Sequence, residues 1–487
     1  MPTDNLDLVS RLSQDEKTLK EHSLRCISPN DAKYGEKSKA LVPYLSADAE
    51  WRAFALVQRT LLETRIEYEQ AEQWNLDEVD QALEKISPLN MALLEDKVTH
   101  HDQLAVLDEI GRHVFPETKA LLHPGTTSYD IVDTARSYLF KKAWNEVIRP
   151  EVGKAIDKLC NLAEKSLNMI MVGRTHLQDT SPITFGGMLA GYAARFTNRL
   201  KRCDTDFKDL RGKISGIVGT GASIEMVIGE GKATSFELNV LNKLGLKADY
   251  TATQIVQKER LADIGHSLTT LMLVLRDFAN DIRILYSSAI GEVTSRDNAK
   301  RLGGSSADGL KNNPINYENI RGKAKVVESG MTVLYDMIVS DLQRDLSNSV
   351  EARYQPQQMM AETYEAFCRL NKALPQLSTN EDRMAANLIP IRENPSEAMT
   401  AILKGEGWVH STYGTGHEFV KEMGKITKSE RSKLLDTALE DSEFRSLYQT
   451  LPQDKRDILN GQLEKYAGNT VNKAKLNIDY AKAIIGR

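Results

Sequence analysis

Apolar residues recur at helical spacing through the middle of the chain, in runs much longer than those near its ends. Between residues 257 and 296 the apolar positions lie three and four residues apart without a proline, which predicts one helix roughly 60 Å long. Four further long runs cover residues 131–163, 184–210, 316–347 and 357–374. In the first of them we expect a kink at Pro150, because proline cannot complete the helical hydrogen bonds. Helices of this length are typical of an elongated bundle or an oligomeric core, so we expect a homo-oligomer.

Shorter helical runs flank this middle part on both sides. In residues 1–123 they are separated by turn residues such as Ser87-Pro88, and beyond about residue 378 they shorten again. The sequence therefore predicts an all-α protein with three domains. These are an N-terminal helical domain at residues 1–123, a central long-helix bundle at 124–378 and a small C-terminal helical domain at 379–487.

The charge balance and the cysteines argue against several classes of protein. The 63 lysine and arginine residues against 68 aspartate and glutamate residues give a formal net charge of −5, so we expect no nucleic acid partner. The first residues lack the basic start and apolar run of a signal peptide, and no apolar run approaches membrane-spanning length. We therefore predict a soluble, cytoplasmic protein without a membrane partner. The cysteines, Cys26, Cys160, Cys203 and Cys368, are far apart and suit reduced thiols better than disulfides or a zinc site.

Three short motifs suggest cofactor or metal sites, but each lacks a required part. The segment Gly229-Glu230-Gly231-Lys232 lacks the leading glycine and the following Ser or Thr of a phosphate loop. No convincing strand precedes Gly219-Thr220-Gly221, as a dinucleotide fold would require. His100, His101 and Asp102 could bind a metal, but neighbouring residues on a helix point about 100° apart and no second ligand cluster is evident. We therefore expect neither a metal nor a cofactor.

Four polar segments stand out from the helical pattern, each at or near the end of a predicted helix. They cover residues 99–102, 125–130, 173–178 and 303–319. Each has an ordinary explanation: Ser128 or Asp130 could cap a helix, and His176 could be a buried, hydrogen-bonded histidine. The Gly- and Ser-rich segment could be a solvated linker that ends where a helix begins, just after Pro314. Together the four supply hydroxyl, imidazole, amide and ammonium groups from the ends of a bundle, which favours a site built from several segments.

These segments resemble the signature sequences of the fumarase/aspartase superfamily. The superfamily's mobile-loop signature, Gly-Ser-Ser-x-Met-Pro-x-Lys-x-Asn-Pro, is matched at unchanged spacing by Gly304, Ser305, Ser306, Lys311, Asn313 and Pro314. Residues 125–135 are similar to its first signature and residues 173–176 to its second. The resemblance extends over most of the chain. Residues 28–34 are similar to the family's N-terminal nucleotide-binding turn. Two further segments, Gln254-x-x-Gln257-x-x-Arg260 and 344–353, are similar to the adenylosuccinate lyases in particular.

The chain departs from these patterns at two places. Asp308-Gly309 stands where the mobile loop usually has Met-Pro, which adds a negative charge and flexibility beside the serine. Ala32-Lys33 stands where many members have Gly-Arg, so the charge remains but the bidentate guanidinium fork is lost. We expect the second change to weaken the contact with a phosphate group.

The resemblance implies a fold and a reaction. The fold is the three-domain helical type of the superfamily, assembled as a homotetramer with a multi-helix core in which one site draws segments from three subunits. The reaction is an anti elimination that breaks a C–N or C–O bond and releases fumarate. Ser305 would be the base and His176 the acid, with Glu318 orienting the imidazole. Lys311 and Asn313 would hold the substrate carboxylates and lower the proton affinity of the serine once the loop has closed. The resemblance implies no cofactor and no metal.

The resemblance also implies a set of substrate-binding residues. The predicted ligands of the succinyl group and the ribotide are His100, His101, Asp102, Thr127, Ser128, Thr175, Gln254 and Asn313. The predicted ligands of the phosphate and nucleotide are Lys33, Tyr34, Arg344, Ser349 and Arg353. Guanidinium forks match phosphate geometry, although Arg344 and Arg353 could also belong to a solvated helix face.

Three functional hypotheses remain open at this point. The first is elimination from the succinyl derivatives of AMP and of the aminoimidazole carboxamide ribotide of purine biosynthesis. The second is a related lyase that releases fumarate from another succinyl amine, which the paired Arg344 and Arg353 make less favoured than a phosphorylated ribotide. The third is a catalytically weak relative that binds nucleotide, which only Asp308-Gly309 favours.

Overall fold

The computed structural model describes residues 7–28, 31–295 and 311–486, apart from the side chains of residues 32–34, 37 and 348. The chain divides into two compact units. The first comprises Met1–Gly153, Arg199–Arg276 and Asn319–Arg369, and the second comprises Lys154–Asn198, Asp277–Glu318 and Leu370–Arg487. The three-domain division expected from the sequence stays a prediction.

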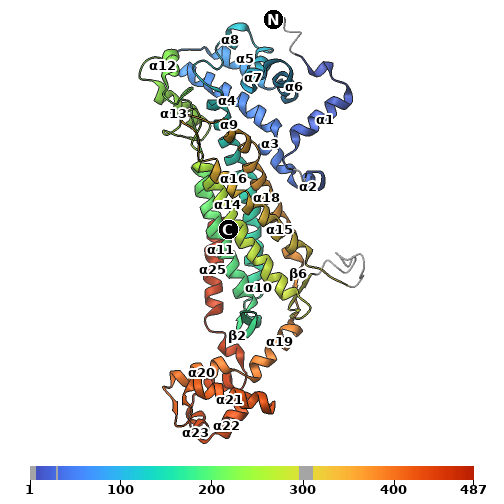
Figure 1. Ribbon diagram of the computed structural model, residues 1–487, viewed down its shortest axis with the longest axis vertical. Helices are drawn as coiled ribbons and strands as arrows, with labels where there is room; N and C mark the ends of the chain where they lie inside the picture. Colours follow the sequence, from blue (N-terminus) through green and yellow to red (C-terminus); the bar gives the residue numbers. More distant parts are fainter. Residues whose placement is uncertain (1–6, 29–30, 296–310, 487) are drawn as a thin grey trace. The chain divides into compact units, whose positions relative to one another are not determined.

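Helices that are short apart from α4 (Ala47–Glu67) form the N-terminal part of the first unit (Figure 1). They are α1 (Gln14–Arg25), α2 (Asp31–Ser38), α3 (Val42–Leu45), α4 (Ala47–Glu67), α5 (Gln73–Leu83), α6 (Pro88–Leu94), α7 (Asp102–Gly111) and α8 (Pro116–Ala120). α4 is the longest of these, and the Ser46 hydroxyl caps its start by accepting from the Ala49 N–H. It packs against α5, α7 and α9 through buried residues that include Trp51, Phe54 and Leu61. This apolar core holds α7 and α9, the helices that begin at Asp102 and Ser128.

The long helices follow the predicted runs. α9 (Ser128–Ala143) continues through a π-helical turn (Trp144–Ile148) into α10 (Arg149–Lys165). At the kink expected near Pro150, the structure has the π-helical turn Trp144–Ile148, in which the backbone hydrogen bonds join residues five apart. The other long helices are α11 (Phe185–Lys208), α14 (Glu259–Tyr286), α15 (Ile315–Ser329) and α18 (Gln355–Ala373). α15 begins directly after Pro314, as predicted.

Two of the predicted runs extend too far. α14 ends at Tyr286 rather than near residue 296, because Gly291 takes a left-handed conformation (φ 66°) and the Glu292 N–H closes the helix end on the Leu285 carbonyl at 3.0 Å. The run 316–347 breaks at Gly330, between α15 and α16 (Met331–Asp336). A Cβ at Gly330 would lie only 2.2 Å from Gln355 Nε2 and 2.8 Å from Met359 Sδ, so a larger residue there would displace these side chains.

The strands in the described residues are short and form four two-stranded sheets. Since helices make up most of the described chain, the predicted all-α class is confirmed. Three sheets are antiparallel pairs: β1 (Ile170–Thr175) with β2 (Gln178–Thr184), β5 (Val293–Ser295) with β6 (Leu377–Thr379), and β7 (Val409–His410) with β8 (Gly414–Thr415). The fourth is a parallel pair of β3 (Arg211–Gly212) with β4 (Lys247–Ala248). The remaining helices of the first unit are α12 (Ala222–Ile228), α13 (Ala233–Lys243) and α17 (Ser347–Glu351).

Short helices also form the C-terminal part of the second unit (Figure 1). They are α19 (Glu381–Glu393), α20 (Ser396–Gly405), α21 (Gly416–Glu430), α22 (Leu434–Glu440), α23 (Ser442–Thr450) and α24 (Gln453–Leu459), followed by the longer α25 (Thr470–Ile485). Helices α20 to α23 pack around a separate apolar cluster that includes Met399, Leu403, Phe419 and Phe444. In the part of the chain that the structure describes, no helix combines the length and the apolar character needed to cross a membrane.

A buried ion pair fixes the start of α9. The ammonium of Lys213 contacts the carboxylate of Asp130, and both side chains are fully buried. The same carboxylate accepts hydrogen bonds from the backbone N–H groups of Thr127 (2.6 Å), Ser215 (3.0 Å) and Gly216 (3.2 Å). Since each buried charge has partners, removing one side of the pair would leave the other uncompensated.

We expect Lys213→Met to lower the unfolding free energy by about 3–5 kcal/mol, because it leaves the Asp130 carboxylate buried without a cation. Denaturant unfolding followed by circular dichroism measures this change. Lys232→Met, at an exposed lysine, is the matched control and should change stability by no more than about 0.5 kcal/mol. Equal stability of the two variants would contradict a structural role for the buried pair.

Candidate functional site

The predicted site residues that the structure describes fall into two groups, one in each unit. The first unit contains His100, His101, Asp102, Thr127, Ser128, Gln254, Arg344, Ser349 and Arg353. The second unit contains Thr175, His176, Lys311, Asn313 and Glu318. The backbone of Lys33 and Tyr34 lies in α2, but their side chains are outside the description. Ser305, the predicted base, lies outside the described residues.

His101 and Ser128 are joined across two helix starts. His101 is the N-cap of α7, and its Nδ1 faces the Leu104 N–H at 3.5 Å. Its Nε2 lies 3.1 Å from the hydroxyl of Ser128, the first residue of α9. Nδ1 also lies 3.5 Å from Asp102 Oδ1, so the tautomer of the ring decides whether His101 or Ser128 donates in this pair. Both side chains are close to solvent, where a ligand can reach them.

The cap of α9 differs from both alternatives drawn from the sequence. Thr127, not Ser128 or Asp130, is the N-cap, and the Asp130 carboxylate accepts from the Thr127 N–H at 2.6 Å. Thr127 is therefore engaged in the helix start, with its side chain in a capping box. Ser128 lies one residue further on, outside the cap, which leaves its hydroxyl available to His101.

Arg344 is the centre of the second cluster in the first unit. Its Nη1 donates to Gln254 Oε1 and its Nη2 to the Ser349 hydroxyl, both at 3.0 Å. The guanidinium lies over the ring of Tyr129, 3.8 Å from its centroid. The Tyr129 hydroxyl donates in turn to Ser349 at 2.6 Å. Arg344 and Ser349, both predicted as phosphate ligands, are thus in direct contact, and Gln254, predicted as a ligand of the succinyl group or the ribotide, joins them through Arg344.

Two features leave this cluster ready for an anion. Arg344 Nε is buried and has no hydrogen-bond partner among the described residues. The guanidinium has no carboxylate partner among them either, since its printed partners are a neutral amide and a hydroxyl. A cation held by neutral groups keeps its full charge for a ligand, and a fork of this kind suits phosphate.

The other predicted ligands of the first unit lie around Glu95. Burial and the charge of Asp102 raise the pKa of the Glu95 carboxyl, while Arg353 and His101 act in the opposite direction. Arg353 is exposed and free to reach a ligand. His100 is also exposed and takes a left-handed conformation (φ 49°) at the end of the π-helical turn Glu95–Thr99. Its backbone rather than its side chain has a structural role here, since its N–H bonds the Glu95 carbonyl at 2.9 Å.

His176 lies at the tip of the β1–β2 hairpin in the second unit. The segment 173–178 is therefore a hairpin and not a helix end, and His176 is exposed rather than buried. His176 and Leu177 form the two-residue turn, both with positive φ (53° and 60°). Such turns usually contain glycine or asparagine, and other residues there cost about 1–3 kcal/mol each. A strained turn that presents an exposed imidazole is typical of a functional position.

A buried clamp holds the base of this hairpin. Arg174 donates to both oxygens of Glu292 (3.0 and 2.8 Å) and pairs with Asp179 at 2.9 Å. Glu292 is fully buried and also accepts from the Asn387 amide at 2.8 Å. Bidentate, buried pairs of this kind hold a side chain in one geometry. Sequence reasoning assigned no role to Glu292, because 118 residues separate it from Arg174 and no local pattern links them.

Glu318 does not reach His176 within the described chain. Its carboxylate is about half exposed and faces Arg283, with Oε1 3.6 Å from Nε. Lys311 is exposed, and Asn313 is partly buried just before the start of α15. The orientation of His176 by Glu318 stays a prediction.

No metal centre is present among these groups. In the stretches of chain that the structure describes, no cluster of three or more His, Cys, Asp and Glu side chains is placed to hold a metal ion. His101 and Asp102 instead lie at the start of α7, where their side chains interact with the helix and with Ser128.

Two enzymes of known structure have a similar fold. The 3-carboxy-cis,cis-muconate lactonizing enzyme from Pseudomonas putida superposes with a TM-score of 0.78, over 92% of this chain and 97% of that one, at 18% identity. A fumarate lyase from Mesorhizobium sp. BNC1 gives 0.75, over 91% and 97%, also at 18% identity. At such low identity, these similarities define the class of fold alone.

Sequence comparison identifies the family. A family profile described as a lyase matches residues 29–328, more than half of the chain. The chain therefore belongs to this lyase family, which is part of the fumarase/aspartase superfamily.

Two relatives are named adenylosuccinate lyase. The one from Staphylococcus saprophyticus is 34% identical over 295 residues, and the one from Bacillus subtilis is 36% identical over 270. The alignments cover 60% and 54% of this chain, and 66% and 59% of the two relatives. The chain thus matches less than two thirds of the length of each of them.

We expect Glu292→Gln to loosen the hairpin that carries His176, because the neutral amide cannot replace the charged fork to Arg174. Amide hydrogen exchange in residues 170–184 should become at least about tenfold faster, which corresponds to a loss of roughly 1.4 kcal/mol in local stability. Glu393→Gln, at an exposed glutamate, is the control. Unchanged exchange in Glu292→Gln would show that the clamp does not hold the turn.

Proposed function

We propose that the protein is an adenylosuccinate lyase, which releases fumarate from adenylosuccinate and from the succinyl derivative of the aminoimidazole carboxamide ribotide. The observation that carries this proposal is the cluster of Arg344, Gln254, Ser349 and Tyr129, an anion site that offers donors and no carboxylate. A ribotide phosphate is the part of these substrates that would bind there. The two relatives named adenylosuccinate lyase support the same choice.

The proposed reaction is an anti elimination carried out by side chains. Ser305 removes the proton from the carbon next to a succinyl carboxylate, with Lys311 and Asn313 holding that carboxylate and stabilising its charge. The electrons of the broken C–H bond form the double bond of fumarate, and the C–N bond breaks. His176 delivers a proton to the departing nitrogen, so the products are fumarate and the free amine.

The position of His176 suits the acid role. Its imidazole is exposed at the tip of the hairpin, and histidine is the side chain used most often for general acid catalysis. Its hairpin turn is strained while the base of the hairpin is clamped, so the ring can be aimed without being packed in a core.

The proposal includes a homotetramer with shared active sites. In the described chain Glu318 faces Arg283 and not His176, which supports an acid whose orienting partner belongs to another copy. We further propose that the enzyme acts in the cytoplasm on small nucleotides, without a cofactor.

Incubation of the pure protein with adenylosuccinate, followed by purine absorbance, tests the proposed substrate. Turnover supports the proposal. Fumarate release only from another succinyl amine would place the enzyme elsewhere in the superfamily. Binding of adenylosuccinate without turnover would indicate a weak relative, and replacing Asp308-Gly309 by Met-Pro would then show whether this departure slows the loop.

We expect Ser305→Ala and His176→Ala each to lower kcat by at least about a hundredfold, because each removes one proton-transfer group. Size-exclusion chromatography with light scattering should show the same assembly as the unchanged protein. His417→Ala, at an exposed histidine of α21, is the control and should keep full activity. Near-normal activity in either test variant would remove that residue from its proposed role.

Substitutions of Tyr129 test the phosphate cluster. Tyr129→Leu removes both the ring under Arg344 and the hydroxyl on Ser349, so KM for adenylosuccinate should rise about tenfold with little change in kcat. Tyr129→Phe keeps the ring and should show a smaller rise. For succinyladenosine, which lacks the phosphate, the two variants should match the unchanged enzyme. An equal rise in KM for both substrates would contradict a role in phosphate binding.

A further inference from the structure

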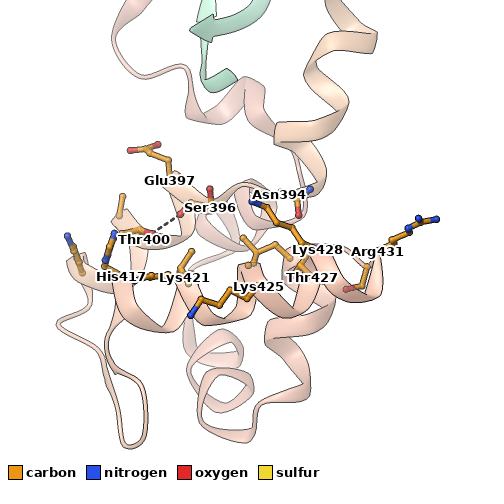
Figure 2. Close-up of a pocket in the computed structure, with 16 residues that line it drawn as sticks. Asn394, Ser396, Glu397, Thr400, His417, Lys421, Lys425, Thr427, Lys428 and Arg431 are labelled. Carbon is orange, nitrogen blue, oxygen red and sulfur yellow. Dashed lines mark hydrogen bonds between the residues drawn. The ribbon is translucent and has the colours of Figure 1, made fainter. Parts of the chain in front are cut away.

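A basic cavity lies in the C-terminal part of the second unit (Figure 2). None of the residues that line it is among the site residues predicted from the sequence. Its volume is about 1010 Å³. It is lined by residues of α20 and α21 and by the segment that follows α21. A cavity of this size accommodates a ligand as large as a nucleotide.

The lining carries a concentration of positive charge. Lys421, Lys425 and Lys428 are spaced at i, i+4 and i+7, so they share one face of α21. Lys404 faces the same cavity from α20, and Arg431 lies at the end of α21. Like charges at this helical spacing repel one another and destabilise the helix unless an anion lies between them.

Three of the acidic groups near these cations are engaged, while Glu430, the last residue of α21, is exposed. Glu397 is the acidic residue among those that line the cavity, and in Figure 2 it points away from the lysines. It accepts from the Ser181 hydroxyl at 3.0 Å, and Tyr466 also bonds to it; burial and this bond raise the pKa of Tyr466. On α21 itself, Glu418 is held by Thr415 in the helix cap, and Glu422 pairs with Lys425 at 2.6 Å.

Among the described residues, four cations of the cavity therefore lack a directly paired carboxylate. Lys421 still acts on Glu418 at longer range, since the Thr415 hydrogen bonds and the charges of His417 and Lys421 lower the pKa of Glu418. Within the described ranges, Lys404, Lys421, Lys428 and Arg431 form no ion pair. The whole chain has a formal net charge of −5, so this surface is a local exception and not part of a generally basic protein. Charge complementarity thus points to an anionic occupant.

We propose that this cavity binds a small-molecule polyanion that carries two or more linked phosphate groups. Lys421 and Lys428 are seven residues apart, which corresponds to about 10 Å along a helix. A chain of phosphates spans this distance and contacts successive lysines, whereas a single phosphate would have to draw both flexible side chains to one point. Lysine ammonium groups bind phosphates as point charges and need no fixed fork geometry. The site is separate from the proposed elimination and does not depend on it.

Calorimetric titration with inorganic tripolyphosphate tests this site in the full-length protein. The titration uses the Arg344→Gln variant, so that the proposed phosphate site of the first unit does not contribute. We expect saturable binding at 0.15 M ionic strength, at least about tenfold tighter than binding of orthophosphate. The absence of saturable binding, or equal affinity for orthophosphate, would overturn the proposal.

Lysine substitutions locate the binding. Lys421→Gln with Lys428→Gln should weaken tripolyphosphate binding at least about tenfold, because two of the contacting charges are removed. Lys404→Gln, on the other helix, should weaken it by a smaller factor and serves if the double variant does not fold. Lys473→Gln with Lys475→Gln, at exposed lysines of α25, is the matched control. An equal loss in the control, or tighter binding of an acidic peptide than of tripolyphosphate, would overturn the proposal.

Discussion

The buried carboxylate of Asp130 is the constraint on which the first group of site residues depends. It neutralises Lys213 and accepts the backbone N–H groups of Thr127, Ser215 and Gly216, so it fixes where α9 begins. The next residues, Ser128 and Tyr129, then have defined positions, and they contact His101 and the Arg344 cluster respectively. A charge that could not be left unpaired in the interior thereby orders hydroxyl and guanidinium groups that a ligand can reach.

The second unit uses the same arrangement at the β1–β2 hairpin. The fully buried Glu292 holds Arg174 and Asn387, while the two turn residues beyond the clamp, His176 and Leu177, are exposed and strained. In each unit a buried carboxylate with several hydrogen-bond partners, Asp130 or Glu292, fixes the backbone that carries an accessible polar side chain. Such supporting contacts account for how a catalytic group can be exposed to substrate and still be held in place. Among the described residues that line the basic cavity of α20 and α21, no buried acid positions the lysines of α21. Their arrangement follows from their spacing along that helix.

The sequence predicted the helical class, the long runs and the start of α15 after Pro314, because these depend on periodicity and on proline geometry. It failed where two local structures share one pattern. The residues after Tyr286 were expected to continue the helix but form a turn and the short strand β5, and both Thr127 and Ser128 are residues that can cap a helix. The motifs placed His176 and Arg344 in the site, but the clamp by Glu292 and the stack on Tyr129 depend on contacts between distant segments. No spacing rule within one sequence reveals such contacts.

The central claim is that Ser305 of one copy and His176 of another act on the same substrate molecule. Mixing Ser305→Ala and His176→Ala proteins, with subunit exchange by mild denaturation and refolding, tests it most directly. If the two residues come from different subunits, about one quarter of the sites in an equal mixture contain both native groups, and the mixture should recover about that fraction of the activity. If both come from the same subunit, no site is complete, and a mixture as inactive as its two components would contradict the account.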